Sequence, residues 1–220
     1  MTAIRSAGRW SLDHSMPTVL AANALALAVY FVGPALLGTA PAHEYLLPNL
    51  ALAWTPFVAS LGVEAYARMN RRRSMWACGV VWLLFLPNAP YLLTDLHHLG
   101  EGPATPWLNL ARFVAFGWAG LVLGLTSLRI VQRTVDARAG RFAGWMLVVG
   151  GAIASGVGIA IGRFGRLNSW QVITQPKLVA SEALRLGASP QAIGVAGFFC
   201  FFILVMYTAM ATYRIPRRSS

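Results

Sequence analysis

Apolar residues along the chain are grouped into six long runs that are separated by shorter polar stretches. The runs lie at about 17–38, 48–67, 75–93, 107–128, 142–162 and 191–213. Each is close to the roughly 20 residues that a helix needs to cross a hydrocarbon core. Backbone amides find no water in lipid, and the runs lack strand-like alternation. The pattern therefore predicts an all-α membrane protein with about six transmembrane helices in one polytopic domain, residues 1–220.

The composition supports lipid as the solvent. Of the 220 residues, 57% are hydrophobic and 11% are charged, against about 25% charged in soluble domains. The mean hydropathy is +0.58, and a soluble fold of this length cannot hide so much apolar surface. The net charge of +11 does not indicate nucleic-acid binding, because the basic residues stand in clusters between the apolar runs.

The distribution of arginine predicts the orientation. One set of arginines falls on a single side of the six predicted helices: Arg5, Arg9, Arg68, Arg71, Arg72, Arg73, Arg129, Arg133, Arg138, Arg141, Arg214, Arg217 and Arg218. The first-to-second and third-to-fourth loops, on the other side, carry no Lys or Arg. The positive-inside rule then places both termini in the cytoplasm. The bias for arginine over lysine is typical of a GC-rich bacterial genome.

The loop between the fifth and sixth predicted helices breaks the charge pattern, because it carries Arg163, Arg166, Lys177 and Arg185. Within it, the stretch KLVASEALRLG (177–187) has the spacing of a short amphipathic helix, which we expect on the outer surface. Small residues recur every four positions in the two preceding helices. They are Gly120 and Gly124, then Ala154, Gly158 and Gly162. This spacing predicts close helix–helix packing.

The stretch LFLPNAPYLLTDLHHLGEG (84–102) turns from apolar to polar at the outer end of the third predicted helix. Pro87 and Pro90 remove amide donors and free carbonyls in the last turns. Asn88 can donate and accept hydrogen bonds there. It marks either a self-satisfied kink or a broken helix end that lines a polar cavity. The same Leu-Pro-Asn sequence occurs at 47–49, also towards the outer face.

Asp95 and His98 follow at a spacing of three residues, so they can share a helix face. Such a carboxylate–imidazole pair is a candidate catalytic pair, usable as a general base or as half a metal site. The metal signal is weak, because no second His or Cys stands at ligand spacing. Solvated loop residues are the alternative interpretation.

The segment GRFGRLNSW (162–170) supplies further candidates. If the fifth helix continues, Arg163 and Arg166 face the same way. They would pair with Asp95 and Glu101, or bind an anion bidentately. Arg112 would join them or extend outward to the interface. The candidate substrate-binding residues are Asn88, Arg163, Arg166 and Asn168.

The motifs FLPNAPYLLTDLHHL (85–99) and GRFGRLNSW (162–170) resemble those of a family of bacterial integral membrane proteins, domain of unknown function 1361. The resemblance runs from about the second predicted helix to the sixth. It implies a polytopic inner-membrane protein and no particular activity.

The expected function is therefore argued from the residues alone. We expect an outer-face site that binds or processes an anionic or lipid-linked substrate, with membrane lipid as a partner. Hydrolysis or group transfer is favoured over redox chemistry, since no haem or flavin signature is visible. A small transporter and a structural or accessory subunit of a membrane complex are the alternatives. The sequence specifies no cofactor, metal or oligomeric state.

Overall fold

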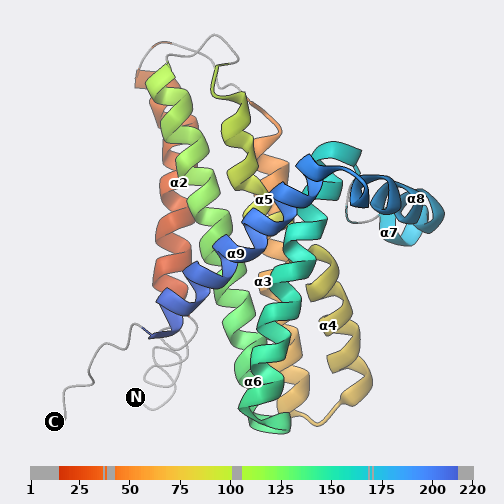
Figure 1. Cartoon of the computed structure of the whole chain (residues 1–220). Helices are drawn as coiled ribbons and strands as arrows, with labels where there is room; N and C mark the ends of the chain where they lie inside the picture. The colour runs from red at the N-terminus through yellow and green to blue at the C-terminus, as the bar shows by residue number, and fades with distance from the viewer. Residues whose placement is uncertain are drawn as a thin grey trace, which may run out of the picture.

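The computed structural model describes residues 15–36, 38, 43–100, 106–167, 169 and 171–212. In these ranges all the regular secondary structure is helical (Figure 1). The elements are α2 (Met16–Leu36), α3 (Leu46–Arg68), α4 (Arg72–Phe85), α5 (Asn88–Tyr91), the 3-10 helix η1 (Leu92–His98), α6 (Pro106–Gly165), α7 (Gln171–Thr174), α8 (Pro176–Gly187) and α9 (Pro190–Thr212).

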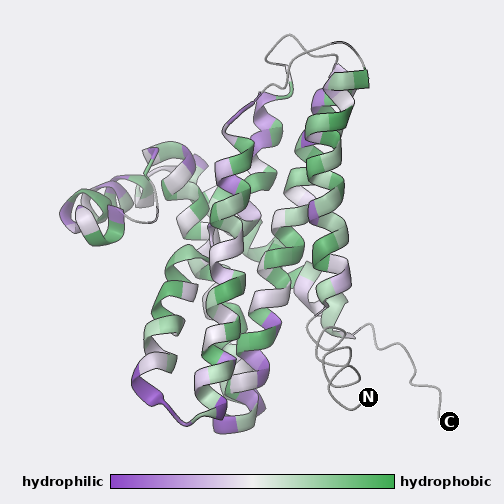
Figure 2. Cartoon of the chain, turned by 180° about the vertical axis from the view of Figure 1, so that it is seen from behind, coloured by the Kyte–Doolittle hydropathy of each residue, from purple (hydrophilic) through white to green (hydrophobic). Residues whose placement is uncertain are grey.

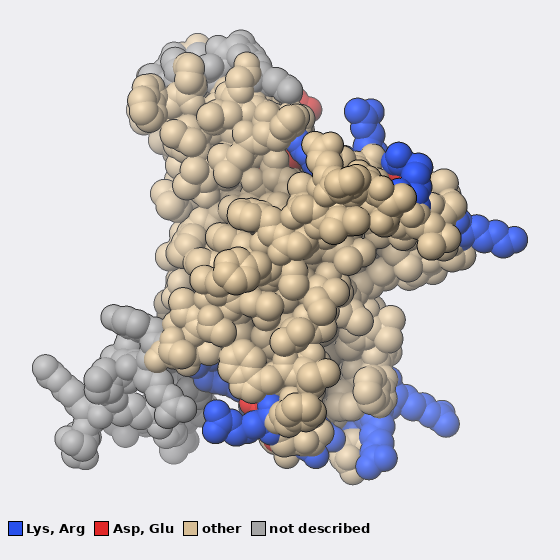
Figure 3. Space-filling view, viewed as in Figure 1, with Lys and Arg blue, Asp and Glu red and all other residues tan. Residues whose placement is uncertain are grey.

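Within the part of the chain that the structure describes, five helical stretches are long and apolar enough to cross a membrane. They are Met16–Leu36, Leu46–Arg68, Arg72–His98, Pro106–Gly165 and Pro190–Thr212. Hydrophobic residues cover the middle of the bundle, and hydrophilic residues gather towards its ends and on the lateral projection (Figure 2). On the face seen in Figure 3, charged side chains likewise leave a broad uncharged band between them. The prediction of an all-α chain with membrane-like helices is confirmed.

The 60-residue helix α6 contains a reversal of the chain. Gly140 has φ 85° and ψ 164°, which is not helical, and Figure 1 shows the two limbs, 106–139 and 141–165, running side by side in opposite directions. The sequence predicted a loop from 129 to 141 at this place, and that boundary was wrong. No Pro or Gly interrupts residues 129–138, so the helix continues until Gly140 supplies the positive φ that the turn requires.

The third predicted helix breaks where its prolines stand. α4 ends at Phe85, and the chain resumes as α5 and then η1. The end expected near residue 93 was too early, because the 3-10 helix continues to His98. A 3-10 helix stacks residues three apart on the same side, which matters for Asp95 and His98.

The short helix α5 is held between the two limbs of α6 by glycines. A Cβ atom on Gly120 would overlap the carbonyl oxygen of Ala89, and one on Gly158 would lie 2.5 Å from Pro87. Gly124 and Gly162 approach the same helix, with Ala89 and Tyr91 as their neighbours. The close packing predicted from the four-residue spacing is confirmed at these glycines.

α9 crosses the bundle obliquely and packs on α6 (Figure 1). A Cβ on Gly156 would overlap the carbonyl oxygen of Ala196. At the far end of α9, the Tyr207 hydroxyl donates to Gln132 of α6. α2 lies along the first limb of α6, where the rings of Tyr30 and Phe116 meet edge to face. These contacts place the first limb at the centre of the bundle.

α7 and α8 project sideways from the bundle (Figure 1). The helix expected at 177–187 is present as α8, with Pro176 in its first turn. Proline is well suited to that position, because its fixed φ is helical and its missing amide would have no partner there. Glu182 and Arg185 form an ion pair on the exposed surface of α8.

Substitution of Gly120 tests the central packing. In Gly120→Ala the new methyl group displaces the Ala89 carbonyl, and overpacking of this kind costs about 1–3 kcal/mol. We expect the apparent melting temperature in detergent to fall by several degrees. In the matched variant Gly150→Ala of the same helix, the methyl group meets nothing within 4 Å, so Ala should leave stability unchanged or raise it. Equal melting temperatures for the two variants would contradict the packing.

Candidate functional site

A groove of about 590 Å³ opens between α3, α4, α5, the second limb of α6 and the α7–α8 segment. Its volume falls within the roughly 300–1,000 Å³ of small-molecule pockets. Most of its wall is apolar, formed by residues such as Val80, Leu83, Leu84, Ile153, Val157 and Ile161. Four lining residues carry polar side-chain groups: Asn49, Asn88, Tyr91 and Ser169. The groove thus offers a long hydrocarbon surface with a few fixed hydrogen-bonding groups.

Asn88 sits at the helix break, where its side-chain amide donates two hydrogen bonds. Its Nδ2 donates to the Phe85 carbonyl at 3.2 Å, one of the groups near the proline break. The same amide donates to the Ser169 hydroxyl at 2.9 Å. Asn88 therefore stabilises the kink and ties it to the segment after α6, while its side chain forms part of the groove wall.

Asp95 lies in η1 with only 2% of its surface exposed. Asn49 of α3 makes a side-chain hydrogen bond to its carboxylate, and Arg163 and His98 are close enough to interact with it electrostatically. The second carboxylate oxygen, Oδ2, has no hydrogen-bond partner within the described ranges. A buried carboxylate oxygen without a donor is uncommon, since leaving it unpaired costs about 1–3 kcal/mol or more.

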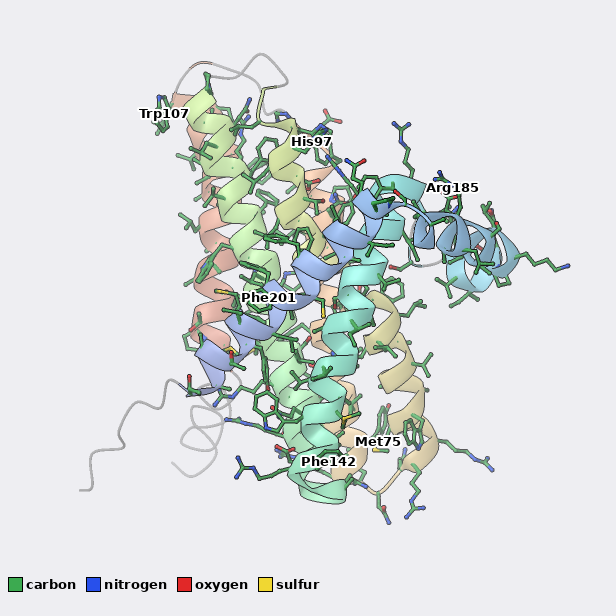
Figure 4. All side chains as sticks on the ribbon, in the orientation of Figure 1. Met75, His97, Trp107, Phe142, Arg185 and Phe201 are labelled. Carbon is green, nitrogen blue, oxygen red and sulfur yellow. The ribbon has the colours of Figure 1, made fainter. Side chains whose placement is uncertain are left out.

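Arg163 reaches from the second limb of α6 to η1. Its Nη1 and Nη2 atoms each lie 3.4 Å from Nε2 of His98. A guanidinium only donates, so Nε2 must accept, and the proton of a neutral imidazole is then on Nδ1. The ring of Tyr45 packs edge-on against His98, with centroids 5.8 Å apart. His97, next to this pair, lies towards the same end of the bundle as Trp107, opposite Met75 and Phe142 (Figure 4).

Asn49 joins the groove to these charged residues. It lines the groove and bonds to Asp95. We call the group Asn49, Asp95, His98 and Arg163 the polar cluster, and of its four members Asn49 alone is among the described lining residues of the groove. Neither Asn49 nor Tyr45 was singled out from the sequence. The repeated Leu-Pro-Asn sequence could have pointed to Asn49, because the asparagines of both copies line the same groove.

Arg166 was the second arginine predicted for this site. α6 ends at Gly165, and Arg166 has φ 52° with an exposed side chain. The face that Arg163 and Arg166 were expected to share does not form, because the helix stops between them. Asn168 and Glu101 lie outside the described residues.

Arg112 neither joins the polar cluster nor extends to the surface. It is fully buried in the first limb of α6, with Nη1 3.3 Å from Oδ1 of Asn109 and with Tyr30 of α2 nearby. The expectation that it snorkels outward was wrong, because α2 covers this side of the limb.

Metal binding has limited support in this geometry. No group of three or more His, Cys, Asp and Glu side chains at metal-binding distance occurs in the described part of the chain. Asp95 and His98 together supply two ligands, fewer than the three or four protein ligands of a typical zinc site. The polar cluster is better suited to binding an organic anion or to moving a proton.

Comparison with known proteins places the chain in a family. The chain belongs to the family described as protein of unknown function (DUF1361), whose model matches residues 48–206. The match extends from the start of α3 into α9, and so includes the groove and the polar cluster. Neither the curated proteins nor the solved structures include a match to the chain.

The bond between Asn88 and Ser169 can be measured with a double-mutant cycle. Asn88→Ala should lower the free energy of unfolding by about 1–3 kcal/mol, because it also leaves the Phe85 carbonyl without its donor. Ser169→Ala should cost less, since it removes only one of these bonds. Thermal unfolding of both single variants and the double variant should show a coupling of about 0.5–1.5 kcal/mol. Strict additivity would mean that the two side chains do not interact.

Proposed function

We propose that this family member is a bacterial inner-membrane protein whose polar cluster and groove bind, and act upon, an anionic lipid-linked substrate at the outer membrane surface. In this arrangement the two limbs of α6 cross separately, which gives six crossings with both termini in the cytoplasm. Support comes from the arginines near the Phe142 end of the bundle, because the positive-inside rule assigns that end to the cytoplasm. The Trp107 end would then face outward.

The observation that carries the proposal is the position of Asn49, which lines the apolar groove and bonds to the buried Asp95. A hydrocarbon chain fits the wall formed by α4 and the second limb of α6. An anionic head group on that chain would lie by the polar cluster, within reach of the Arg163 guanidinium. Arginine suits this role because its planar fork matches carboxylate and phosphate oxygens.

Each residue then has a distinct task. Arg163 binds the anionic group, and Asn88 orients the substrate beside the kink. Asp95 and His98 accept and return a proton, which a hydrolysis or group-transfer reaction requires. Asp95 also balances the charge of Arg163 when the site is empty. Arg166 and Asn168, which follow α6, are proposed to contact the substrate at the mouth of the groove.

The projecting segment α7–α8 fits a position in the membrane surface. Ile173 and Leu184 are 73% and 79% exposed, while the Glu182–Arg185 pair occupies the polar side. Apolar side chains of a surface helix can insert at the boundary of head groups and acyl chains. Since Val172 and Val179 also line the groove, this segment would border the route by which a lipid-linked molecule enters.

Filling the groove tests whether it holds a hydrocarbon chain. Gly150 lines the groove, and a Cβ atom added there meets nothing within 4 Å. In Gly150→Leu the new side chain therefore has room to project from the groove wall. We expect native mass spectrometry of the purified protein to show loss of a co-purifying lipid-like mass that the wild-type protein carries. Gly197→Leu on α9, also unobstructed, is the matched control and should keep that mass. A wild-type protein without any such mass, or equal retention in both variants, would contradict the proposal.

Single substitutions in the polar cluster separate a substrate site from a structural or accessory role. If the cluster serves a substrate, Asp95→Asn, His98→Ala and Arg163→Gln should each retain most of the folded yield in size-exclusion chromatography. Arg163→Gln should also lose the anionic species that the wild-type protein carries, whereas Asp95→Asn, which removes a negative charge from beside Arg163, should keep it. If the charges only join helices, each change should collapse the yield, and the exchange Asp95→Arg with Arg163→Asp should restore it. That second pattern would favour an accessory subunit.

A further inference from the structure

A second hollow lies at the Phe142 end of the bundle, away from the groove. It has a volume of about 320 Å³ and is formed between the last turns of α3 and the C-terminal part of the first limb of α6. The lining residues are Glu64, Ala67, Arg68, Arg133, Thr134, Ala137 and Arg138. None of them takes part in the polar cluster.

Among the described lining residues, three carry a guanidinium group and one carries a carboxylate, so these residues have an excess of two positive charges. Arg68 Nη2 lies 2.7 Å from Glu64 Oε1, and Arg138 Nη2 donates to the Ala67 carbonyl near the end of α3. The Thr134 hydroxyl donates to the Ile130 carbonyl at 3.0 Å. These bonds hold two of the guanidiniums at the rim, and each retains further N–H donors because arginine has five.

Further basic side chains and large aromatic side chains lie at the same end of the bundle, outside the hollow. Arg71, Arg72 and Arg73 begin the neighbouring helix α4 with exposed side chains, and basic side chains gather at this end in Figure 3. Large apolar side chains lie at the same end, and Trp76 and Phe142 are 68% and 80% exposed. A basic hollow with exposed aromatic groups nearby is typical of helices that meet lipid head groups at the membrane surface.

We propose that the hollow between α3 and α6 is a binding site for a phosphate group, with Arg68, Arg133 and Arg138 as its ligands. The phosphate is that of an anionic phospholipid head group or of a free phosphate compound, since guanidiniums recognise both in the same way. Glu64 orients Arg68 and limits the charge excess when the site is empty. The site does not depend on the activity proposed for the groove.

The test compares two double variants with the same change in net charge. Arg68→Gln with Arg133→Gln removes two ligands of the hollow and keeps the Arg138 bond to α3. Arg72→Gln with Arg73→Gln removes two exposed charges outside it. Delipidated protein is titrated with phosphatidylglycerol, phosphatidylcholine and inorganic phosphate, and bound species are counted by native mass spectrometry. Circular dichroism and elution volume check that each variant is folded, and the single variant Arg133→Gln replaces the double one if it is not.

We expect the hollow variant to bind phosphatidylglycerol about tenfold more weakly than wild type, a difference of about 1.4 kcal/mol, and the control variant to bind within about twofold. Phosphatidylcholine should bind weakly to all three proteins. Competition by millimolar inorganic phosphate would assign the site to a free phosphate compound, and resistance to it would assign the site to a lipid head group. Equal losses in the two variants, or no loss in the hollow variant, would overturn the proposal.

Discussion

The close approach of α5 to both limbs of α6 is the contact on which the rest of the structure depends. Gly120 leaves room for the Ala89 carbonyl of this single helical turn, and Gly124, Gly158 and Gly162 leave room for the side chains of Ala89, Pro87 and Tyr91. Because α5 is fixed in that position, α4 must diverge from the second limb of α6 on one side of the break, which opens the groove. On the other side of the break η1 continues past the first limb and carries Asp95 into the bundle.

A helix break in an apolar bundle is stable only if its polar groups find partners. Pro87 and Pro90 withdraw two amide donors, and the Asn88 side chain supplies a donor to the Phe85 carbonyl. The bond from Asn88 to Ser169 then fixes the chain that leaves α6. The amide that donates to the Phe85 carbonyl at the kink therefore also holds Ser169, which lines the groove.

Much of the architecture follows from the sequence. The apolar runs are long enough to span a membrane as helices and lack the alternation of β-strands, so helices are the expected spanning structure. The break at Pro87 and the helix at 177–187 were equally accessible from local chemistry. The helix ends that differ from the prediction have causes that are harder to recognise in the sequence. A charged stretch continued as helix up to Gly140, and the end of α6 was set by the positive φ of Arg166, a residue that rarely adopts it. The role of Asn49 depends on where α3 meets η1, which no spacing along the chain reveals.

The composition of the polar cluster argues against a purely structural origin. Asp95 is buried and Arg163 is half-buried. Both groups lose hydration that their attraction only partly restores, and apolar replacements of buried ion pairs are often as stable. Here the contact between Arg163 and His98 is long, at 3.4 Å, and Oδ2 of Asp95 has no donor in the described ranges. An arrangement selected for stability alone would shorten these contacts or remove the charges. Stability alone therefore does not explain an unpaired carboxylate oxygen that is buried near an apolar groove and a broken helix.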